Sequence, residues 1–421
     1  MINNELQNIF NGMTESIISK EQIDYDNIIE RSSSISVANE SSSIADSITA
    51  EDLSIYPTDE FSKKLKKNFR KLVGKKQKYE ETIGTHPDFK HLEKTNDSEQ
   101  HYIVSMFVDI KNSTSIYLKT KDLIRTKYIK NTMLRIITIF MQVFDGHIHR
   151  LQGDAVFSYF GWKDKCEEDA IIDSLNAASF LLYYIENELN QQLEKQQLSP
   201  IKLRIGIDFG EQEEVLWSEY GLPGSTEVTT TSLHTDLAAK LQNQASANSI
   251  MIGDNIKTFL DLPAEFITKK TYQENGEKKE KDYILKKPEK YYKMWVFQHK
   301  NYLKYFPFLE NKSYSMICTT NGSQYFPNIS ALDKRMELNF HLYHPLTIPP
   351  RGINNIRFEW SKENRGKEAK DNKSEGRLAA NKTKNNIAEE GTLFRGHHIM
   401  KCKTFQNGRV QNEIKFGIFI K

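Results

Sequence analysis

The chain has little of what marks secreted, membrane-spanning or disulfide-bonded proteins. Its three cysteines, Cys166, Cys318 and Cys402, are far apart and odd in number, which argues against a disulfide framework or a zinc site. No apolar run approaches the roughly 18 residues of a membrane span, and the first residues lack the basic and apolar regions of a signal peptide. We therefore expect a cytoplasmic protein with no membrane span.

A large net charge of either sign is also missing. The net charge is +2 at pH 7, although 27% of the residues are charged, and this balance gives no strong nucleic-acid signal. The hydrophobic fraction of 38% suits a globular protein with some disordered segments. At 421 residues the chain is long enough for two or three domains.

The first hundred residues divide into two parts. Residues 1–58 are expected to be a flexible N-terminal region, because the segment 31–50 is rich in serine and poor in large apolar groups. Residues 59–99 are predicted to be a basic helix with a lead-in to the next domain. Apolar residues recur there at spacings of three and four among lysines and arginines: Phe61, Leu65, Phe69 and Leu72. Such a helix suits a membrane surface or nucleic acid, but we expect it to pack on the next domain with its lysines in water.

Residues 100–300 alternate between strand and helix patterns. Strands are predicted at 103–110, 147–152, 155–160, 202–209 and 249–252, and helices at 123–144, 169–189 and 232–243. Their order, βαββαβ with a final αβ, predicts an α+β fold with a ferredoxin-like palm, whose antiparallel-rich sheet carries helices on one face. Residues 301–421 show short alternating apolar runs between turn signals, which predict a separate, mostly-β domain.

Two aspartates in the predicted palm occupy positions that suit metal-assisted phosphoryl transfer. Asp109 and Asp154 lie at the end of, or just past, apolar runs that predict buried strands. A buried carboxylate without a partner is costly, so each should be paired, hydrogen-bonded or metal-bound. On neighbouring strands the two can hold divalent cations that polarise a triphosphate and activate a hydroxyl group. Taken singly, each also fits a turn or a helix cap.

Four segments together resemble the class III nucleotidyl cyclases. In order and spacing they are FVDIKNST, DGHIHRLQGDAVF, LRIGIDFG and SLHTDLAAKLQ. Over roughly residues 84–262 the chain looks most similar to the bacterial pyrimidine cyclases of the Pycsar anti-phage systems. The resemblance implies an enzyme that converts UTP or CTP to 3′,5′-cyclic UMP or cyclic CMP and pyrophosphate.

The resemblance assigns a metal site. Asp109 and Asp154 match the metal-binding aspartates of the family, and the backbone carbonyl of Ile110 would complete a site for two divalent cations, Mn²⁺ or Mg²⁺. In the implied mechanism these ions activate the ribose 3′-hydroxyl and stabilise the departing pyrophosphate. Gly153 lets its hairpin bring Asp154 close to phosphate.

The resemblance also assigns catalytic side chains to a helix. Asp236 and Lys240 stand where the family usually has an Asn and an Arg that support the ribose and the transition state. A spacing of four places both on one helix face. Lys240 can put positive charge on the reacting phosphate, but without the bidentate geometry of arginine. The alternative is a surface ion pair between the two.

The resemblance assigns recognition of the substrate's base to Arg150 and Thr229. Arg150 stands at the base-reading position, which is Lys in adenylyl and Glu in guanylyl cyclases, and the companion position falls near Thr229. Arginine only donates hydrogen bonds, which argues against GTP and more weakly against ATP. Uracil O4 and O2 suit the arginine slightly better than cytosine, which still offers O2 and N3. The alternative is a plain surface arginine.

The resemblance implies partners as well. In class III enzymes one subunit supplies the metal aspartates and the other supplies the helix and the base-reading residues, so a head-to-tail homodimer is expected. The cyclic nucleotide would activate a separate effector, a TIR-type NAD hydrolase or a membrane protein, without direct contact. A lysine should bind the triphosphate, and the sequence does not choose between Lys287, Lys290 and Lys293.

Residues 301–421 resemble the AGS-C sensor domain of some bacterial defence enzymes. Trp360, Asn364 and two glycines fit its pattern. His397 and His398 are neighbours on a predicted strand and should point to opposite faces, so we do not expect them to bind one metal. We expect structural or weakly ligand-contacting histidines. Two other functions stay open: an adenylyl or guanylyl cyclase, and a catalytically silent nucleotide-binding sensor.

Overall fold

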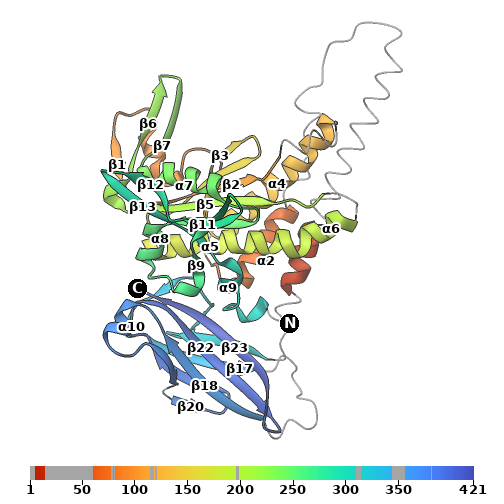
Figure 1. Ribbon diagram of the computed structural model, residues 1–421, viewed down its shortest axis with the longest axis vertical. Helices are drawn as coiled ribbons and strands as arrows, with labels where there is room; N and C mark the ends of the chain where they lie inside the picture. Colours follow the sequence, from red (N-terminus) through yellow and green to blue (C-terminus); the bar gives the residue numbers. More distant parts are fainter. Residues whose placement is uncertain are drawn as a thin grey trace.

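The computed structural model of the chain consists of a mixed part, here called the palm domain, and a β-rich C-terminal domain beyond one end of it (Figure 1). It describes residues 5–14, 60–76, 79, 81–113, 118, 121–195, 199–309, 314–343, 356–380 and 382–421. The serine-rich segment at 31–50 lies outside the described residues. Among the helices that are described, none is long and apolar enough to cross a membrane.

The palm domain is built on one eight-stranded sheet. Its strands follow the order β12-β13-β8-β5-β2-β4-β3, with β9 paired to β13, and β5 and β8 run parallel while the other neighbours are antiparallel. The strands are β2 (Ile103–Ile110), β3 (His147–Gln152), β4 (Ala155–Phe160), β5 (Leu203–Gly210), β8 (Ser249–Gly253), β9 (Ile267–Thr268), β12 (Tyr283–Lys287) and β13 (Lys290–Phe297).

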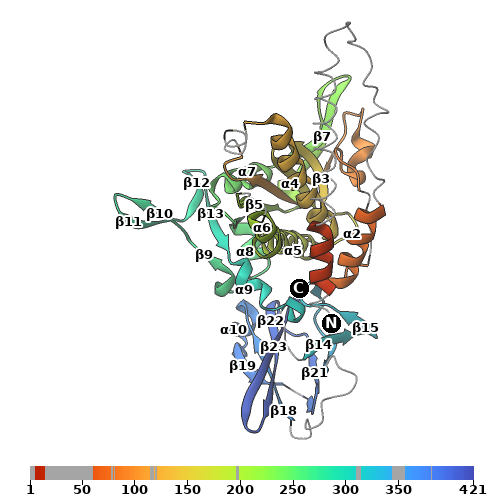
Figure 2. The same cartoon turned by 90° about the vertical axis from the view of Figure 1, so that its right-hand side faces the viewer.

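Helices and smaller hairpins surround this sheet. The helices are α2 (Glu60–Leu72), α4 (Leu123–Val143), α5 (Glu167–Tyr184), α6 (Asn190–Lys195), α7 (Leu233–Gln244), α8 (Asp254–Phe259) and α9 (His299–Leu303). A small sheet of β1 (Ser98–Gln100), β6 (Leu216–Leu222) and β7 (Ser225–Thr231) rises from the palm in Figure 1, and the hairpin of β10 (Lys270–Glu274) and β11 (Glu277–Lys281) projects from it in Figure 2. The predicted order βαββαβ, followed by αβ, is confirmed.

The two faces of the sheet are covered by different helices. Along β2, Val104, Met106 and Val108 belong to the same buried cluster as the apolar residues of α4 and α5. The alternate residues face α7, because the Ser105 Oγ lies 2.9 Å from the Thr235 Oγ1 of that helix. A Cβ atom on Gly206 of β5 would lie 2.1 Å from a backbone nitrogen of α7, so only glycine permits this close packing.

The α+β palm is therefore confirmed, with one correction. The helices were predicted on one face of the sheet, whereas α7 covers the other face. The physical reason is that β2 and β5 carry polar residues and glycine on this side, which leave room for a helix backbone to approach.

The basic helix α2 packs on the palm, as predicted. Phe69 is fully buried and its ring makes edge contacts with Phe140 and Phe144 of α4. The expectation that its lysines stay in water is wrong for Lys66, which is buried, as is Arg70. Lys66 Nζ pairs with Glu81 and donates to the Gln142 side chain at 2.9 Å, and Arg70 donates to Asp145 at 2.6 Å; these partners offset the cost of burying the charges.

The region 1–58, expected to be flexible, contains a packed helix over residues 5–14. Phe10 is fully buried there, and its ring lies 5.5 Å from that of Phe69 and 5.2 Å from that of Tyr184. This helix belongs to the hydrophobic core of the palm.

The C-terminal domain has two five-stranded sheets, ordered β15-β14-β17-β21-β20 and β16-β23-β22-β18-β19, as the prediction of a mostly-β domain requires. Its elements are β14 (Ser315–Thr320), β15 (Ser323–Tyr325), β16 (Ala331–Leu332), β17 (Glu337–Tyr343), β18 (Ile356–Asn364), α10 (Lys367–Asp371), β19 (Gly376–Ala379), β20 (Lys382–Lys384), β21 (Ile387–Gly391), β22 (Gly396–Gln406) and β23 (Arg409–Ile420).

The adjacent histidines of β22 are structural, as expected. His397 Nε2 lies 3.0 Å from Asn328 Oδ1, whereas His398 Nε2 lies 2.7 Å from the carbonyl of Phe394. Their separate partners show that the two rings do not share a site.

Polar contacts join the two domains. Arg395 Nη2 donates to the backbone oxygen of Phe259 at the end of α8, at 2.8 Å, and lies 3.2 Å from Glu168 of α5. Asn176 of α5 donates to the carbonyl of Asn328 at 2.8 Å. The C-terminal domain is thus fixed to the helices beneath the palm sheet (Figure 1).

Candidate active site

Asp109 and Asp154 lie next to each other at one edge of the palm. Asp109 is the seventh residue of β2 and pairs in register with Ala155 of β4. The β3–β4 hairpin turns through Gly153, whose φ is +66°, and this turn sets Asp154 directly before Ala155. The two carboxyl groups are close enough to interact, since the charge and hydrogen bonding of Asp154 help to raise the pKa of Asp109.

Two side chains from the α7 face hold Asp109. Arg204 of β5 stands directly opposite it in register, donates from Nε to its Oδ2 at 3.1 Å and forms an ion pair with it. Gln242 of α7 donates to the same oxygen at 3.1 Å. Burial raises the pKa of Asp109, Arg204 lowers it, and Asp154 raises it, so that the net shift is upward. The direction means that Arg204 does not outweigh burial and the neighbouring Asp154.

The Asp154 side chain is not fully satisfied either. Its Oδ2 atom is buried and accepts no hydrogen bond from the described residues. A buried carboxylate oxygen without a donor is unfavourable, and a divalent cation would satisfy it. Neither at this pair nor elsewhere among the described residues do three or more His, Cys, Asp or Glu side chains lie close enough together to hold a metal ion. A metal site on this pair therefore needs further oxygens, from the backbone next to Asp109 and from a ligand.

Asp236 and Lys240 do not join this pair within one chain. Both lie on the exposed face of α7, while its opposite face meets β2 and β5. Neither makes an ion pair with the other or with the aspartates among the residues that the structure describes. The surface ion pair considered from the sequence is not present, and the face that carries both residues is open to a second molecule.

The β3–β4 and β6–β7 hairpins bring Arg150 and Thr229 into one region. The Arg150 side chain donates to Glu227 of β7 from two of its nitrogens. Nε lies 3.2 Å from Oε1, and Nη2 contacts Oε2. Thr229 follows two residues later on the same strand, where its Oγ1 lies 3.1 Å from the Tyr159 hydroxyl. The Arg150 side chain is 47% exposed, so its role in reading the base stays a prediction. The side chain presents donors beside the acceptor oxygens of Glu227.

His149 lies beside this ion pair without adding charge to it. Its Nδ1 lies 3.0 Å from the Gly84 carbonyl, whereas its Nε2 lies 3.0 Å from Glu227 Oε1 but forms no hydrogen bond within the described residues. Burial lowers the pKa of His149 to about 4, so the ring is neutral near pH 7. The charge of the Arg150–Glu227 pair is therefore balanced within the pair.

A buried polar network fixes the start of α7. His234 Nδ1 lies 3.0 Å from Asp208 Oδ2 of β5, its Nε2 lies 3.0 Å from Glu214, and Tyr292 of β13 donates to Asp208 at 2.7 Å. Burial raises the pKa of Asp208. Burial alone would lower the pKa of His234, but Asp208 and then Glu214 outweigh it and raise the pKa above 6.5. The imidazolium is thus held between two carboxylates.

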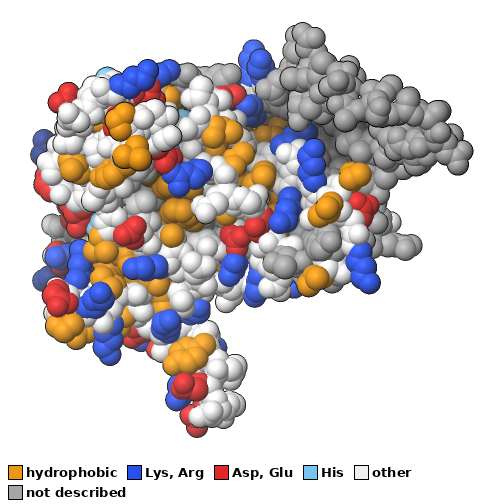
Figure 3. Space-filling view, turned by 90° about the horizontal axis from the view of Figure 1, so that it is seen from above, with side chains coloured by type: hydrophobic (Ala, Val, Ile, Leu, Met, Phe, Trp, Pro, Cys, Tyr) orange, Lys and Arg blue, Asp and Glu red, His pale blue; other side chains and the backbone are white. Residues whose placement is uncertain are grey.

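The three candidate lysines stay undecided. Lys287, Lys290 and Lys293 are all exposed on the β12–β13 hairpin, and Lys290 lies 3.7 Å from Glu214. The upper face of the palm, seen in Figure 3, has basic, acidic and hydrophobic side chains interspersed rather than a basic patch.

The sequence reasoning missed Arg204, Gln242, Glu227 and His234. A signal for the first was available: in the strand LRIGIDFG, Arg204, Gly206 and Asp208 alternate with apolar residues, so they share one face. That face is covered by α7, and strand pairing places Arg204 beside Asp109 of the neighbouring strand β2. No comparable pattern points to Glu227.

Comparison with known proteins matches both parts of the chain. Residues 294–421 match the model of the adenylyl/guanylyl and SMODS C-terminal sensor domain, AGS_C. A cytidylate cyclase from Staphylococcus aureus is 39% identical over 372 residues, which cover 83% of this chain and 86% of that protein. A cytidylate cyclase from Escherichia coli is 30% identical over 369 residues, covering 81% and 79% respectively.

Solved structures match the palm domain more distantly. The adenylyl cyclase CyaB from P. aeruginosa is 18% identical with a TM-score of 0.39, covering 48% of this chain and 95% of that chain. The guanylyl cyclase Cya2 is also 18% identical, with a TM-score of 0.35 and coverage of 48% and 93%.

Proposed function

The chain belongs to the bacterial pyrimidine cyclases of the Pycsar type, and we propose that it converts CTP to 3′,5′-cyclic CMP and pyrophosphate. The proposed chemistry rests on two adjacent carboxyl groups, Asp109 and Asp154, and on the buried Asp154 oxygen that lacks a hydrogen-bond donor. The proposed preference for cytosine rests on the Arg150–Glu227 ion pair.

In the proposed reaction the ribose 3′-oxygen bonds to the α-phosphorus, the bond from that phosphorus to the pyrophosphate oxygen breaks, and the hydroxyl proton passes to solvent. Asp109, Asp154 and the carbonyl of Ile110 would hold two divalent cations. When bound, Mn²⁺ or Mg²⁺ supplies charge to the triphosphate and lowers the pKa of the attacking hydroxyl. Arg204 stands at the same carboxylate and can turn its guanidinium to a phosphate oxygen.

Glu227 changes the expected choice between the two pyrimidines. Arg150 alone suited UTP slightly better, because it only donates. The pair offers donors from Arg150 beside an acceptor on Glu227, and cytosine presents the complementary edge, with acceptors at O2 and N3 and a donor at its 4-amino group. Uracil has a second acceptor at O4, which would face the carboxylate and be repelled. The preference therefore moves to CTP, and an adenylyl or guanylyl cyclase is not favoured.

The complete site would form in a head-to-tail homodimer. Asp236 and Lys240 are exposed on α7 and do not reach the aspartates of their own chain, so we place them opposite the aspartates of a second copy. There Lys240 would neutralise charge on the reacting phosphate and Asp236 would accept a hydrogen bond from the ribose. We further propose that cyclic CMP acts as a messenger in antiviral defence and activates a separate effector, such as a TIR-type or membrane protein.

The test is incubation of the full chain with each of the four nucleoside triphosphates and Mn²⁺, followed by chromatography of the products. We expect cyclic CMP as the main product. In Glu227→Gln, whose amide both donates and accepts, the ratio of kcat/KM for CTP over UTP should fall by about tenfold or more. Glu219→Gln, in the same hairpin but bonded to the backbone of Lys94, is the matched control. Conversion of ATP or GTP alone would overturn the proposal.

A further inference from the structure

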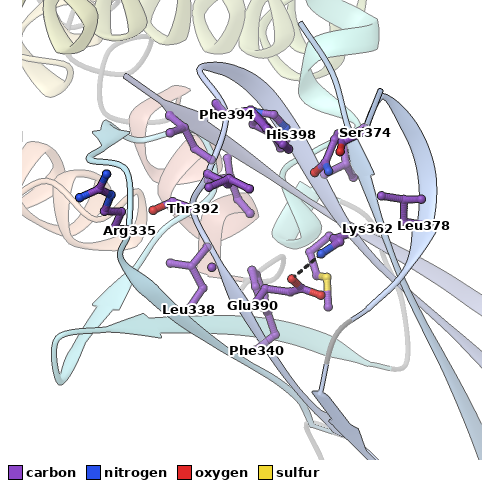
Figure 4. Close-up of a pocket in the computed structure, with 17 residues that line it drawn as sticks. Arg335, Leu338, Phe340, Lys362, Ser374, Leu378, Glu390, Thr392, Phe394 and His398 are labelled. Carbon is purple, nitrogen blue, oxygen red and sulfur yellow. Dashed lines mark hydrogen bonds and ion pairs between the residues drawn. The ribbon is translucent and has the colours of Figure 1, made fainter. Parts of the chain in front are cut away.

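The C-terminal domain contains a cavity of about 340 Å³ between its two sheets (Figure 4). This volume lies in the range of small-molecule sites. Its deep wall is apolar and comes from both sheets, with Leu338 and Phe340 of β17, Ile399 of β22 and Ile418 of β23. Walls of this kind suit a flat, weakly polar group.

One ion pair interrupts the apolar lining. Lys362 of β18 and Glu390 of β21 meet across the cavity at 2.9 Å, and Figure 4 shows both side chains directed toward each other. The side chains are only 21% and 6% exposed. A buried pair is weak in its net contribution to stability, because desolvation offsets the attraction. Its position on a cavity wall favours a role in recognition.

Two other polar side chains of the wall are bonded to the backbone. Thr392 Oγ1 donates to the Asp333 carbonyl at 2.7 Å and accepts from the Met336 amide at 2.8 Å. Both ring nitrogens of His398 have backbone partners. Lys362 and Glu390 instead place an N–H donor directly beside a carboxylate acceptor, a pattern that the edge of a base complements.

A positive group stands at the rim of the same cavity. Arg335 lines it and is exposed, and it forms no ion pair among the described residues. Because Lys362 and Glu390 neutralise each other, Arg335 gives the site a positive charge. This charge would favour a ligand with an anionic tail.

We propose that this cavity binds a mononucleotide of the size of a nucleoside monophosphate. The planar base lies between the apolar walls with its donor and acceptor edge on Lys362 and Glu390, and the phosphate lies at Arg335. This inference does not depend on the proposed cyclase reaction.

The cavity is connected to the palm by a short path along the chain. Thr392, Leu393 and Phe394 line it, and the next residue, Arg395, binds the backbone of Phe259 and lies beside Glu168 in the palm. A nucleotide that contacts Phe394 therefore acts one residue away from the contact between the domains. Such a site is placed to regulate the palm.

The test is calorimetric titration of the full chain with CMP and AMP in EDTA, which keeps metal-dependent binding at the palm out of the measurement. We expect saturable binding of at least one of them, weakened more than tenfold in the double variant Lys362→Met with Glu390→Leu. Removing both charges together leaves no unpaired buried ion, so this variant should fold, which thermal unfolding checks. Lys403→Met with Glu413→Leu removes a cross-strand pair in the same domain, 3.7 Å apart, and should bind normally.

Three outcomes would overturn the proposal. One is that neither CMP nor AMP binds saturably at concentrations up to about 1 mM. Another is equal binding by the wild type and the folded double variant. The third is inorganic phosphate binding as tightly as CMP and AMP, since the base would then play no part. Arg150→Ala, altered in the palm, should bind like the wild type.

Discussion

The conflict between two neighbouring carboxyl groups is the central feature of the palm at the scale of single residues. Asp109 gains a hydrogen bond from Arg204, and yet burial and Asp154 leave its pKa above the ordinary value. The folded protein therefore holds a proton on Asp109 to a higher pH than the unfolded chain does. The stability that this proton provides is present at low pH and is lost as the pH rises through the folded pKa.

Replacing Asp154 by asparagine should separate stability from activity. Without the second charge, the metal-free Asp154→Asn protein is expected to unfold at a higher temperature than the wild type at neutral pH. Cyclase activity should fall by at least about a hundredfold, as when one preorganised electrostatic group is removed. Mn²⁺ should raise the unfolding temperature of the wild type only. Calorimetry with and without EDTA measures these shifts, with the exposed Asp97→Asn as control; a metal-dependent rise in Asp154→Asn would contradict the assignment.

The site residues that the sequence predicts best are those whose neighbours in the sequence already fix their position. Asp109 ends an apolar strand and Asp154 follows a glycine in a two-residue turn, so their proximity follows from strand pairing. Glu227 lies in a strand whose only apolar residue is Val228, and its proposed importance arises only from its ion pair with the Arg150 guanidinium. A partner of this kind is chosen by tertiary contact, which no periodicity records.

At the scale of elements, α7 is the helix on which the proposed site depends. Its exposed face carries Asp236 and Lys240, and its buried start is clamped by His234 between Asp208 and Glu214. Its existence was predicted, but its position on the far face of the sheet was not, because the amphipathic pattern of a helix shows which of its sides is buried and not which face of a sheet it covers. Gly206, which admits its backbone, is informative only once the strand order is known.

The clamp on α7 should make stability depend on pH. Because the pKa of His234 is raised above 6.5, its contribution is fully present below about pH 6.5 and is lost as the pH rises through the folded pKa. The unfolding temperature of the wild type should therefore fall as the pH rises from about 6.5 through the folded pKa of His234. In His234→Gln the unfolding temperature should depend less on pH and should be lower than that of the wild type at acidic pH. Thermal unfolding across pH 5.5 to 9 measures this. His91→Gln, which alters an exposed His–Glu pair, should leave the profile unchanged, and an unchanged profile in His234→Gln would be inconsistent with the clamp.

At the scale of the whole molecule, the proposed site requires two chains. Asp109→Ala and Lys240→Ala should each be inactive alone, for different reasons. Mixed in equal amounts and allowed to exchange subunits, half of the dimers would contain both variants, and each of these would hold one intact site. Activity should return to about a quarter of the wild-type value. A mixture of Asp109→Ala with Asp154→Ala should stay inactive, and equal recovery there would rule out the shared site.

The division into a palm and a β-rich domain was accessible from the sequence, because strand and helix patterns differ clearly on either side of residue 300. The packed helix at residues 5–14 was not. Four of its apolar residues recur at helical spacing and are all buried: Leu6, Ile9, Phe10 and Met13. The segment is short, however, and a helix of this length becomes stable only by packing, here beside Phe69 and Tyr184.

The hydrogen bond from Gln242 to Asp109 has a consequence for how two such chains would work together. Helix α7 touches Asp109, the proposed metal ligand of its own chain, with Gln242, and in the proposed dimer it would serve the opposite chain with Lys240, two residues earlier. Loading of one centre would then shift the helix that completes the other. Turnover would therefore rise with divalent-ion concentration along a sigmoid rather than a hyperbola, with a Hill coefficient above one.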